Sequence, residues 1–198
     1  MRARDNPFRT EQVLKVRYRL PGVGWEDFLD RLAALDYRAM ILGPQGAGKT
    51  TLLEDLAPRL CARGFNPKLL RLRRDGPGFP PGFLGTFFAG LAPQDVILFD
   101  GADHLGRLAW ARFKWRSRRA RGLIATSHGR RLLPLLIECS TSLELLEAII
   151  EEIPDSGAAK LRPLLPAMFR QHQGNLRNAL RHCYDLCAAN AASPRGEV

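Results

Sequence analysis

The chain lacks several features that would assign it to a specialised class of protein. Its four cysteines among 198 residues are few and unevenly spaced, which argues against a disulfide framework and leads us to expect reduced thiols. No apolar run approaches the roughly 20 residues needed to span a bilayer, and residues 1–12 lack the apolar segment of a secretory signal. We therefore expect a cytoplasmic protein with no membrane partner.

Acidic residues are scarce relative to basic ones: 20 Asp and Glu stand against 30 Lys and Arg, which gives a formal net charge of +10. Such a balance favours attraction to nucleic acid or other polyanions. Apolar residues make up 45% of the chain and charged residues 25%, which excludes the composition of a disordered protein. The length suits one medium domain with a small appendage.

Hydrophobic periodicity alternates between strand and helix patterns along most of the chain. Strand patterns occupy 38–42, 68–73, 95–100, 122–126 and 137–140. Helix patterns occupy 25–36, 49–63, 83–91, 105–118 and 130–136. Because parallel strands need crossover connections, this alternation predicts a three-layer α/β/α core around a parallel sheet of about five strands.

The last part of the chain has only helix patterns, which occupy 142–152, 159–173 and 175–189. A small helical subdomain is therefore expected after the core. The predicted domains are a basic N-terminal arm at 1–24, a core at 25–141, a helical lid at 142–190 and a tail at 191–198.

The segment GPQGAGKT, residues 43–50, matches the pattern G-x-x-x-x-G-K-[ST] between a predicted strand and a predicted helix. Glycines let the backbone direct successive N–H groups at phosphates, and the helix N-terminus adds partial positive charge. Lys49 would reach the β- and γ-phosphates, and the Thr50 hydroxyl would ligate Mg²⁺. These residues predict a P-loop NTPase core that binds ATP and Mg²⁺. The residues predicted to bind the nucleotide are Gly43, Pro44, Gln45, Gly46, Ala47, Gly48, Lys49, Thr50 and Thr51.

A P-loop protein also needs an acidic group at a strand end to hold the metal, and Asp100 at the end of VILFD supplies it. The second acid that many such ATPases place next is missing, because Gly101 follows. Asp103 or His104 could orient the attacking water instead. Asp103 has a second reading, as the N-cap of the helix predicted from Leu105. Without a base, the protein would bind ATP and hydrolyse it slowly.

The motifs together resemble the AAA+ and related STAND/ORC-like branch of P-loop ATPases. The resemblance rests on the loop GPQGAGKT, the strand VILFDGAD, the strand end LIATSH and the helix opening GNLRNAL. It implies a sensor 1 residue at Thr126, Ser127 or His128, in contact with the γ-phosphate or the water. It also implies that Arg177 acts as sensor 2, reaching from the lid to the phosphates.

The resemblance implies Mg²⁺-dependent ATP hydrolysis coupled to lid motion and to regulation of a partner. Ordinary structural readings stay open: Arg177 as a solvated helix residue, and Thr126 and Ser127 as N-caps of a following helix. The lid is shorter than is usual for the family. No isolated arginine marks the finger that would reach a neighbouring copy, and Arg130 and Arg131 are the nearest candidates, so assembly into a homo-oligomer stays open.

Residues 107–121, RLAWARFKWRSRRAR, carry seven Arg and Lys and no acid. On a helix, Leu108, Ala111 and Trp115 would face the sheet while the basic side chains face outward and contact nucleic acid. A solvated helix with buried aromatic residues is the alternative. Two further functions compete with the ATPase: a small P-loop kinase, and a nucleic-acid-binding module that uses ATP only as a switch.

Cys183 and Cys187 lie four residues apart on a predicted helix, with His182 beside them. This spacing could place two soft metal ligands on one face. Free cysteine is also a common small core residue, and no second ligand pair occurs nearby.

Overall fold

The computed structural model describes residues 6–8, 20, 23–73, 76, 78–154 and 158–192. These residues divide into two compact units. The sheet unit holds the described residues of 18–43 and 48–139. The helical unit holds those of 140–198, together with 6–8 and the loop 44–47.

The sheet unit is built on five parallel strands. They are β1 (Arg38–Leu42), β2 (Asn66–Arg71), β3 (Asp95–Asp100), β4 (Gly122–Ser127) and β5 (Leu135–Glu138), in the spatial order β2-β3-β4-β1-β5. The apolar runs of β1, β3 and β4 are buried, as expected for parallel strands covered on both faces. Because β4 pairs with both β1 and β3, the carboxyl ends of these three strands are neighbours.

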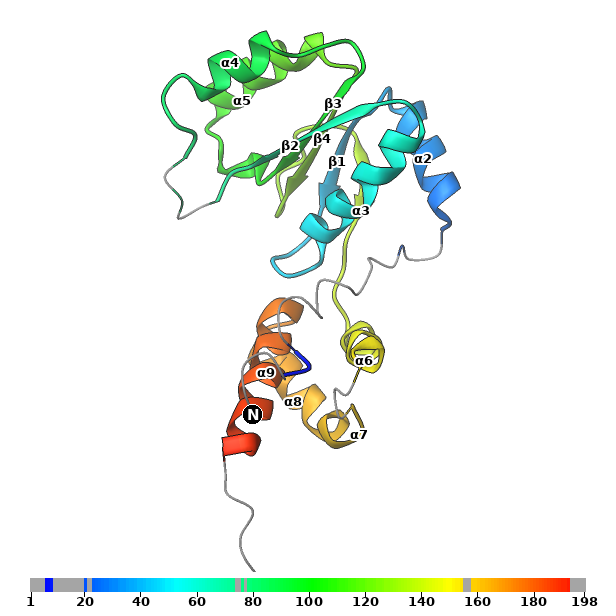
Figure 1. The fold of residues 1–198 in the computed structure, drawn as a ribbon, viewed down its shortest axis with the longest axis vertical. Coiled ribbons are helices and arrows are strands. Elements are labelled where there is room, and N and C mark those ends of the chain that lie inside the picture. Colours follow the sequence, from blue (N-terminus) through cyan, green and yellow to red (C-terminus); the bar gives the residue numbers. More distant parts are fainter. Residues whose placement is uncertain are drawn as a thin grey trace, which may run out of the picture. The chain divides into compact units, whose positions relative to one another are not determined.

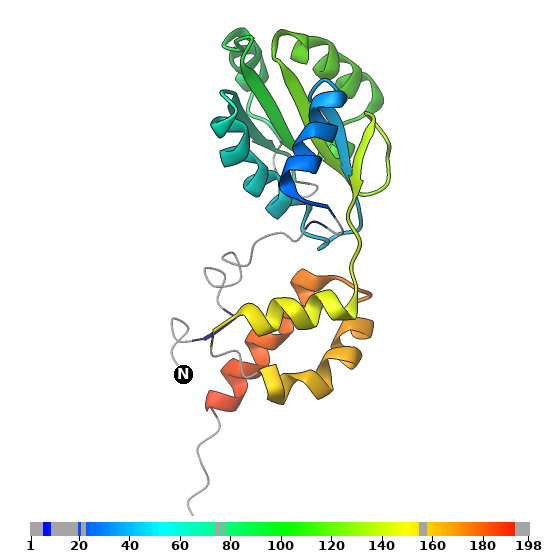
Figure 2. The ribbon, with the colours of Figure 1, turned by 90° about the vertical axis from the view of Figure 1, so that its right-hand side faces the viewer.

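Helices cover both faces of this sheet (Figures 1 and 2). They are α2 (Trp25–Ala34) and α3 (Lys49–Ala62) on one face and α4 (Phe83–Ala89) and α5 (Arg107–Arg116) on the other. Alternate strand side chains enter the two layers, and Phe99 joins the aromatic cluster of Phe88, Trp110 and Phe113 under α4 and α5. The predicted three-layer α/β/α architecture with a five-stranded parallel sheet is confirmed.

The prediction of a helix at 130–136 is wrong, because residues 130–134 form a loop and residues 135–136 begin β5. Pro134 lies in the middle of the segment, and a proline cannot donate the backbone hydrogen bond that a helix interior requires. Its carbonyl oxygen instead accepts a hydrogen bond of 2.8 Å from the Met40 backbone N–H. The fifth strand therefore begins at Leu135, two residues before its predicted start.

The prediction that Leu108 and Trp115 of α5 face the sheet is also wrong. Leu108 is 83% exposed and Trp115 is 67% exposed, whereas Trp110 and Phe113 are buried. The rings of Trp110 and Phe113 stack, and Phe113 packs edge-on against Phe88 at 5.0 Å between ring centroids. These contacts fix the rotation of the helix about its axis and leave Leu108 and Trp115 on the outside.

The helical unit consists of short helices around an apolar cluster that includes Leu146, Ile150, Met168 and Cys183. The helices are α6 (Leu143–Glu152), α7 (Ala158–Leu161), α8 (Leu165–Gln171) and α9 (Leu176–Ala192), with the 3₁₀ turn η4 (Arg162–Leu164) between α7 and α8. The single helix predicted at 159–173 is divided in this way because it contains two prolines. Phe8, from the segment predicted as an N-terminal arm, packs into the same cluster. Residues 1–5, 9–19 and 21–22 of that arm and the tail from 193 lie outside the described residues.

Candidate nucleotide-binding site

The loop after β1 has the backbone geometry of a phosphate-binding turn. Gly43, Gly46 and Gly48 all have positive φ angles, of 150°, 83° and 76°. A Cβ atom at Gly43 would lie 2.4 Å from the Cys139 carbonyl oxygen, so a larger residue cannot fit there. Helix α3 begins directly after Gly48, and its first turn carries no acidic residue. Its free backbone N–H groups and the helix dipole favour an anion at this point.

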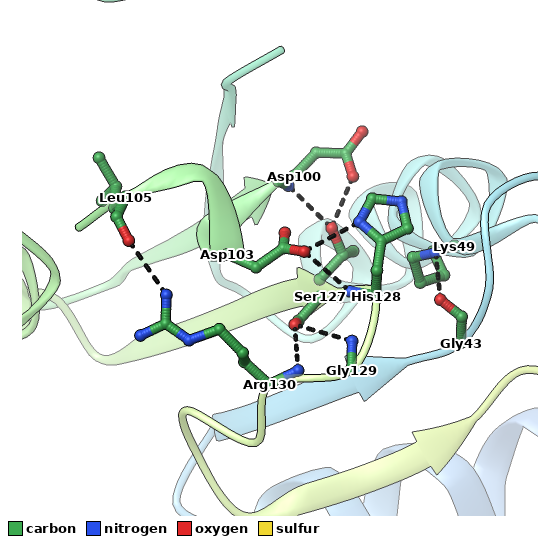
Figure 3. A network of polar contacts seen from close by, with 11 residues as sticks. Gly43, Lys49, Asp100, Asp103, Leu105, Ser127, His128, Gly129 and Arg130 are labelled. Carbon is green, nitrogen blue, oxygen red and sulfur yellow. Dashed lines mark hydrogen bonds and ion pairs between the residues drawn. The ribbon is translucent and has the colours of Figure 1, made fainter. Parts of the chain in front are cut away.

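Lys49 lies at the base of the loop and is buried, with 7% of its surface exposed. Its Nζ donates a hydrogen bond of 2.7 Å to the Gly43 carbonyl oxygen (Figure 3). The ammonium group is therefore held beside the turn that would receive a phosphate.

Both carboxylate oxygens of Asp100 accept hydrogen bonds from threonine hydroxyls. Thr50 Oγ1 donates to Asp100 Oδ2 at 2.7 Å, and Thr126 Oγ1 donates to Asp100 Oδ1 at 2.7 Å. The Thr126 hydroxyl oxygen in turn accepts the Gly101 backbone N–H at 2.9 Å. The ends of β3 and β4 and the first turn of α3 are joined in this way around one carboxylate, and Thr126 fixes its orientation.

The conformation of Gly101 explains why no glutamate follows Asp100. Its φ angle is 86°, in the left-handed region, and a Cβ atom there would lie 2.2 Å from the Leu72 carbonyl oxygen. The strand cannot accept a side chain at this position without a backbone shift. The usual second acid is therefore excluded by the local fold.

Asp103 lies in the 3₁₀ turn η2 (Ala102–His104) and points at His128, just after β4 (Figure 3). Its Oδ2 lies 2.9 Å from His128 Nδ1 and accepts the His128 backbone N–H at 3.1 Å. Burial acts to raise the pKa of Asp103, but the hydrogen bonds from the ring and backbone of His128 outweigh it, so the pKa lies below its usual value. Asp103 is thus a carboxylate that orients the imidazole.

The alternative reading, in which Asp103 is the N-cap of the following helix, is wrong. Helix α5 begins at Arg107, and its N-cap is Gly106. The sequence does not indicate that Asp103 and His128 interact, because 25 residues separate them. The signal that could reveal it is the parallel pairing of β3 with β4, which brings their carboxyl ends together.

Comparisons with known proteins identify the fold but no close relative. The structure is similar to that of a RuvB variant from Thermotoga maritima, with a TM-score of 0.57 and 16% sequence identity over 91% of this chain and 68% of that one. A chain of the Escherichia coli MS115-1 HORMA:CdnC:Trip13 complex gives a TM-score of 0.39 at 13% identity, over 83% and 77% of the two chains. No protein-family model and no curated protein matches. The fold is that of a P-loop NTPase.

The residues at the end of β4 and directly after it serve the local structure of this P-loop fold. Ser127 is fully buried, and its hydroxyl oxygen accepts the backbone N–H groups of Gly129 at 3.4 Å and Arg130 at 3.0 Å. No helix follows for it to cap. The exposed Arg130 donates to the Leu105 carbonyl oxygen at 3.3 Å, and Arg131 is exposed. Of the sensor 1 candidates, only His128 extends an exposed side chain beside Asp103.

Arg177 lies at the start of α9 in the helical unit and is exposed. The preceding residues perform capping chemistry: Gly174 has a φ angle of 76°, and Asn175 Oδ1 accepts the Asn178 backbone N–H at 3.2 Å. The role of Arg177 as sensor 2 stays a prediction.

The cysteines of the helical unit are not arranged as metal ligands. The four cysteines form no disulfide bond among the described residues. Cys183 is fully buried in the apolar cluster, and burial together with the charge of Cys187 raises its pKa to about 12. It is therefore a neutral thiol that fills core space.

Among the described residues, no helix is sufficiently long and apolar to traverse a membrane.

Proposed function

We propose that the chain binds ATP with Mg²⁺ at the carboxyl ends of β1, β3 and β4 and hydrolyses it as an AAA+-like ATPase. The observation that carries this proposal is the bond of 2.7 Å between Thr50 and Asp100 directly beside the glycine-rich loop. It joins the two side chains that a P-loop NTPase uses around its metal. The fold shared with RuvB, an AAA+ P-loop ATPase, supports the same reading.

The donor set at Thr50 and Asp100 fits Mg²⁺, because a hydroxyl and a carboxylate supply the hard oxygen ligands that this ion prefers. When bound, the ion would supply charge neutralisation at the phosphate oxygens. Lys49 would exchange its contact with the Gly43 carbonyl for a phosphate oxygen. Thr126 keeps the Asp100 carboxylate in position and is a positioning residue.

His128 is the group that we assign to the attacking water. Its Nδ1 faces the Asp103 carboxylate, so the proton on that nitrogen is assigned to the hydrogen bond and Nε2 is left to accept a proton. Asp103 stabilises the imidazolium that forms when Nε2 takes the proton from water. The pair takes the place of the glutamate that Gly101 excludes.

The helical unit extends the proposal to regulation. By the family resemblance, Arg177 would contact the phosphates, and lid motion would follow the nucleotide state. The lid would then regulate a protein or nucleic-acid partner, or a second copy of the chain. A P-loop kinase is the competing enzyme class, and release of inorganic phosphate from ATP without any acceptor separates the two.

The proposed function is tested with Lys49→Ala. We expect this variant to lose Mg²⁺-dependent ATP binding in isothermal titration calorimetry and to lose phosphate release. Lys160→Ala is the matched control, because Lys160 is an exposed lysine of the helical unit. Unchanged ATP affinity in Lys49→Ala would contradict the proposal.

A second candidate function, nucleic-acid binding, is favoured by the outer face of α5. The exposed Trp115 lies within a run of exposed basic side chains without acidic neighbours in the helix. These side chains are Arg107, Arg112, Lys114 and Arg116 of α5, and Arg118 and Arg119 of the 3₁₀ turn η3 (Ser117–Arg119) that follows it. Such a surface can neutralise phosphates and stack a base.

Binding of a fluorescent single-stranded oligonucleotide tests this surface. We expect salt-dependent binding that weakens in the triple variant Arg112→Ala, Arg118→Ala and Arg119→Ala, with a shallower dependence on salt because fewer counterions are released. Arg170→Ala, which removes an exposed arginine of α8, is the control. Absent or salt-insensitive binding would remove this function.

A further inference from the structure

The four histidines of the chain form two pairs. His172 and His182 lie 3.1 Å apart between ring nitrogens in the helical unit. His104 and His128 lie in the sheet unit, with 5.8 Å between ring centroids. Among the described residues, only the second pair forms a three-member group of candidate metal ligands, and its third member is Asp103.

The geometry of this group suits a single ion. Asp103, His104 and His128 each offer one ligand atom, and these atoms all lie within 4.8 Å of one another. The side chains come from η2 and from the turn after β4, so two neighbouring strand ends hold them together. Zinc is held by ligand atoms at about 2.0–2.2 Å, and three atoms within 4.8 Å of one another are close enough to share one ion.

An unpartnered oxygen provides a second, independent observation. Asp103 Oδ2 is engaged with His128, whereas Asp103 Oδ1 is buried and has no hydrogen-bond partner among the described residues. A buried acceptor left without a partner is energetically unfavourable. A cation at this oxygen would remove that cost.

We propose that Asp103, His104 and His128 form a binding site for a divalent transition metal of the Zn²⁺ class. Two imidazoles and one carboxylate are the ligands that zinc and its neighbours accept, and three protein ligands leave a position open for water or phosphate. The site is chemically distinct from Thr50 and Asp100, which offer oxygen atoms alone. Zn²⁺ and Mg²⁺ therefore select different carboxylates.

Occupation of this site has a consequence for hydrolysis, which rests on the proposed function. The ion takes up the Asp103 carboxylate and the His128 imidazole, so the pair no longer orients and deprotonates water. Zn²⁺ is therefore an inhibitor of turnover. The binding itself does not depend on ATP.

Calorimetric titration of Zn²⁺ into the nucleotide-free protein tests the site. The Cys61→Ser background removes an exposed thiol that could bind zinc elsewhere. We expect one ion per chain and an affinity that falls at least about tenfold in His104→Gln, the loss that even an outer-shell change can produce. His182→Gln is the matched control from the other histidine pair, and its affinity should be unchanged. Circular dichroism confirms that each variant is folded.

Equal zinc affinity in His104→Gln, loss of binding in His182→Gln, or absence of zinc binding overturns the proposal. A second arm measures phosphate release with and without Zn²⁺. We expect inhibition of the Cys61→Ser protein and little inhibition of His104→Gln in that background. Because the titration contains no nucleotide, its result stands even if the protein does not hydrolyse ATP, which separates failure of this site from failure of the proposed function.

Discussion

Asp100 and Asp103 are three residues apart, yet their surroundings differ in chemistry. Asp100 receives a threonine hydroxyl on each oxygen, at 2.7 Å in both cases. One carboxylate oxygen of Asp103 is hydrogen-bonded to the ring and backbone nitrogens of His128, and the other is buried and has no partner among the described residues. Oxygen donors favour Mg²⁺, whereas imidazole favours proton transfer and softer metals. The same short segment therefore supports two kinds of site.

The backbone between the two carboxylates produces this difference. Asp100 ends β3, where α3 and β4 supply Thr50 and Thr126. Gly101 then takes a left-handed conformation, and the chain enters the turn that carries Asp103. Gly101 and Ala102 separate a carboxylate held by hydroxyls from one held by an imidazole.

Among the variants that test this comparison, Asp103→Asn is expected to have the largest effect. An amide in place of the carboxylate no longer stabilises the His128 imidazolium, so kcat should fall about 10²- to 10⁴-fold, the range for loss of general-base catalysis. ATP affinity in the presence of Mg²⁺ should stay close to that of the wild type, because Thr50, Lys49 and Asp100 are intact. Single-turnover kinetics and calorimetry separate the two quantities. An unchanged kcat would remove the catalytic role of the pair.

Gly101→Ala should have the next largest effect, on stability. The new Cβ atom meets the Leu72 carbonyl oxygen, and the φ angle of 86° is unfavourable for alanine. We expect the free energy of unfolding in urea to fall by about 2–3 kcal/mol, near the upper end for local backbone strain. Gly85→Ala within α4 is the control, because an added Cβ atom there meets no heavy atom within 4 Å and alanine favours a helix. Equal stability of both variants would contradict the account of Gly101.

Much of the fold was accessible from the sequence because it depends on local pattern. The order of strand, glycine-rich loop and helix around Lys49 and the apolar run ending at Asp100 are readable from adjacent residues. The prediction of a helix at 130–136 was wrong because it relied on an apolar run that Pro134 interrupts. The exposed face of α5 was not predictable, since contacts of Trp110 and Phe113 with other elements set it.

The candidate site was predictable to a smaller extent. Sequence spacing identified Asp100 and drew attention to Asp103, but the partner of each side chain depends on strand pairing. Thr126 is one of three residues predicted as sensor 1, and in the structure its hydroxyl donates a hydrogen bond to Asp100. The missing glutamate was visible in the sequence, whereas its cause, the approach of Gly101 to Leu72, is a tertiary contact.

Ser127→Ala is expected to have the smallest effect. It tests whether Ser127 has only a structural role, in contrast to its neighbour His128. Loss of the hydroxyl leaves the backbone N–H groups of Gly129 and Arg130 without this acceptor, so stability should fall by about 1 kcal/mol. ATP affinity and kcat should change little, because the Ser127 side chain is buried in the turn. Urea unfolding and steady-state kinetics measure both. A large fall in kcat with little change in stability would instead identify Ser127 as the sensor.

The most direct test of the two-carboxylate account is a paired calorimetric titration of Asp100→Ala and Asp103→Asn, each with ATP in the presence of Mg²⁺ and, separately, with Zn²⁺ alone. The account predicts that Asp100→Ala loses Mg²⁺-dependent ATP binding and keeps zinc binding, whereas Asp103→Asn keeps the first and loses the second. If both variants lose the same ligand, or if neither loses any, the two carboxylates do not form separate sites and the account is contradicted.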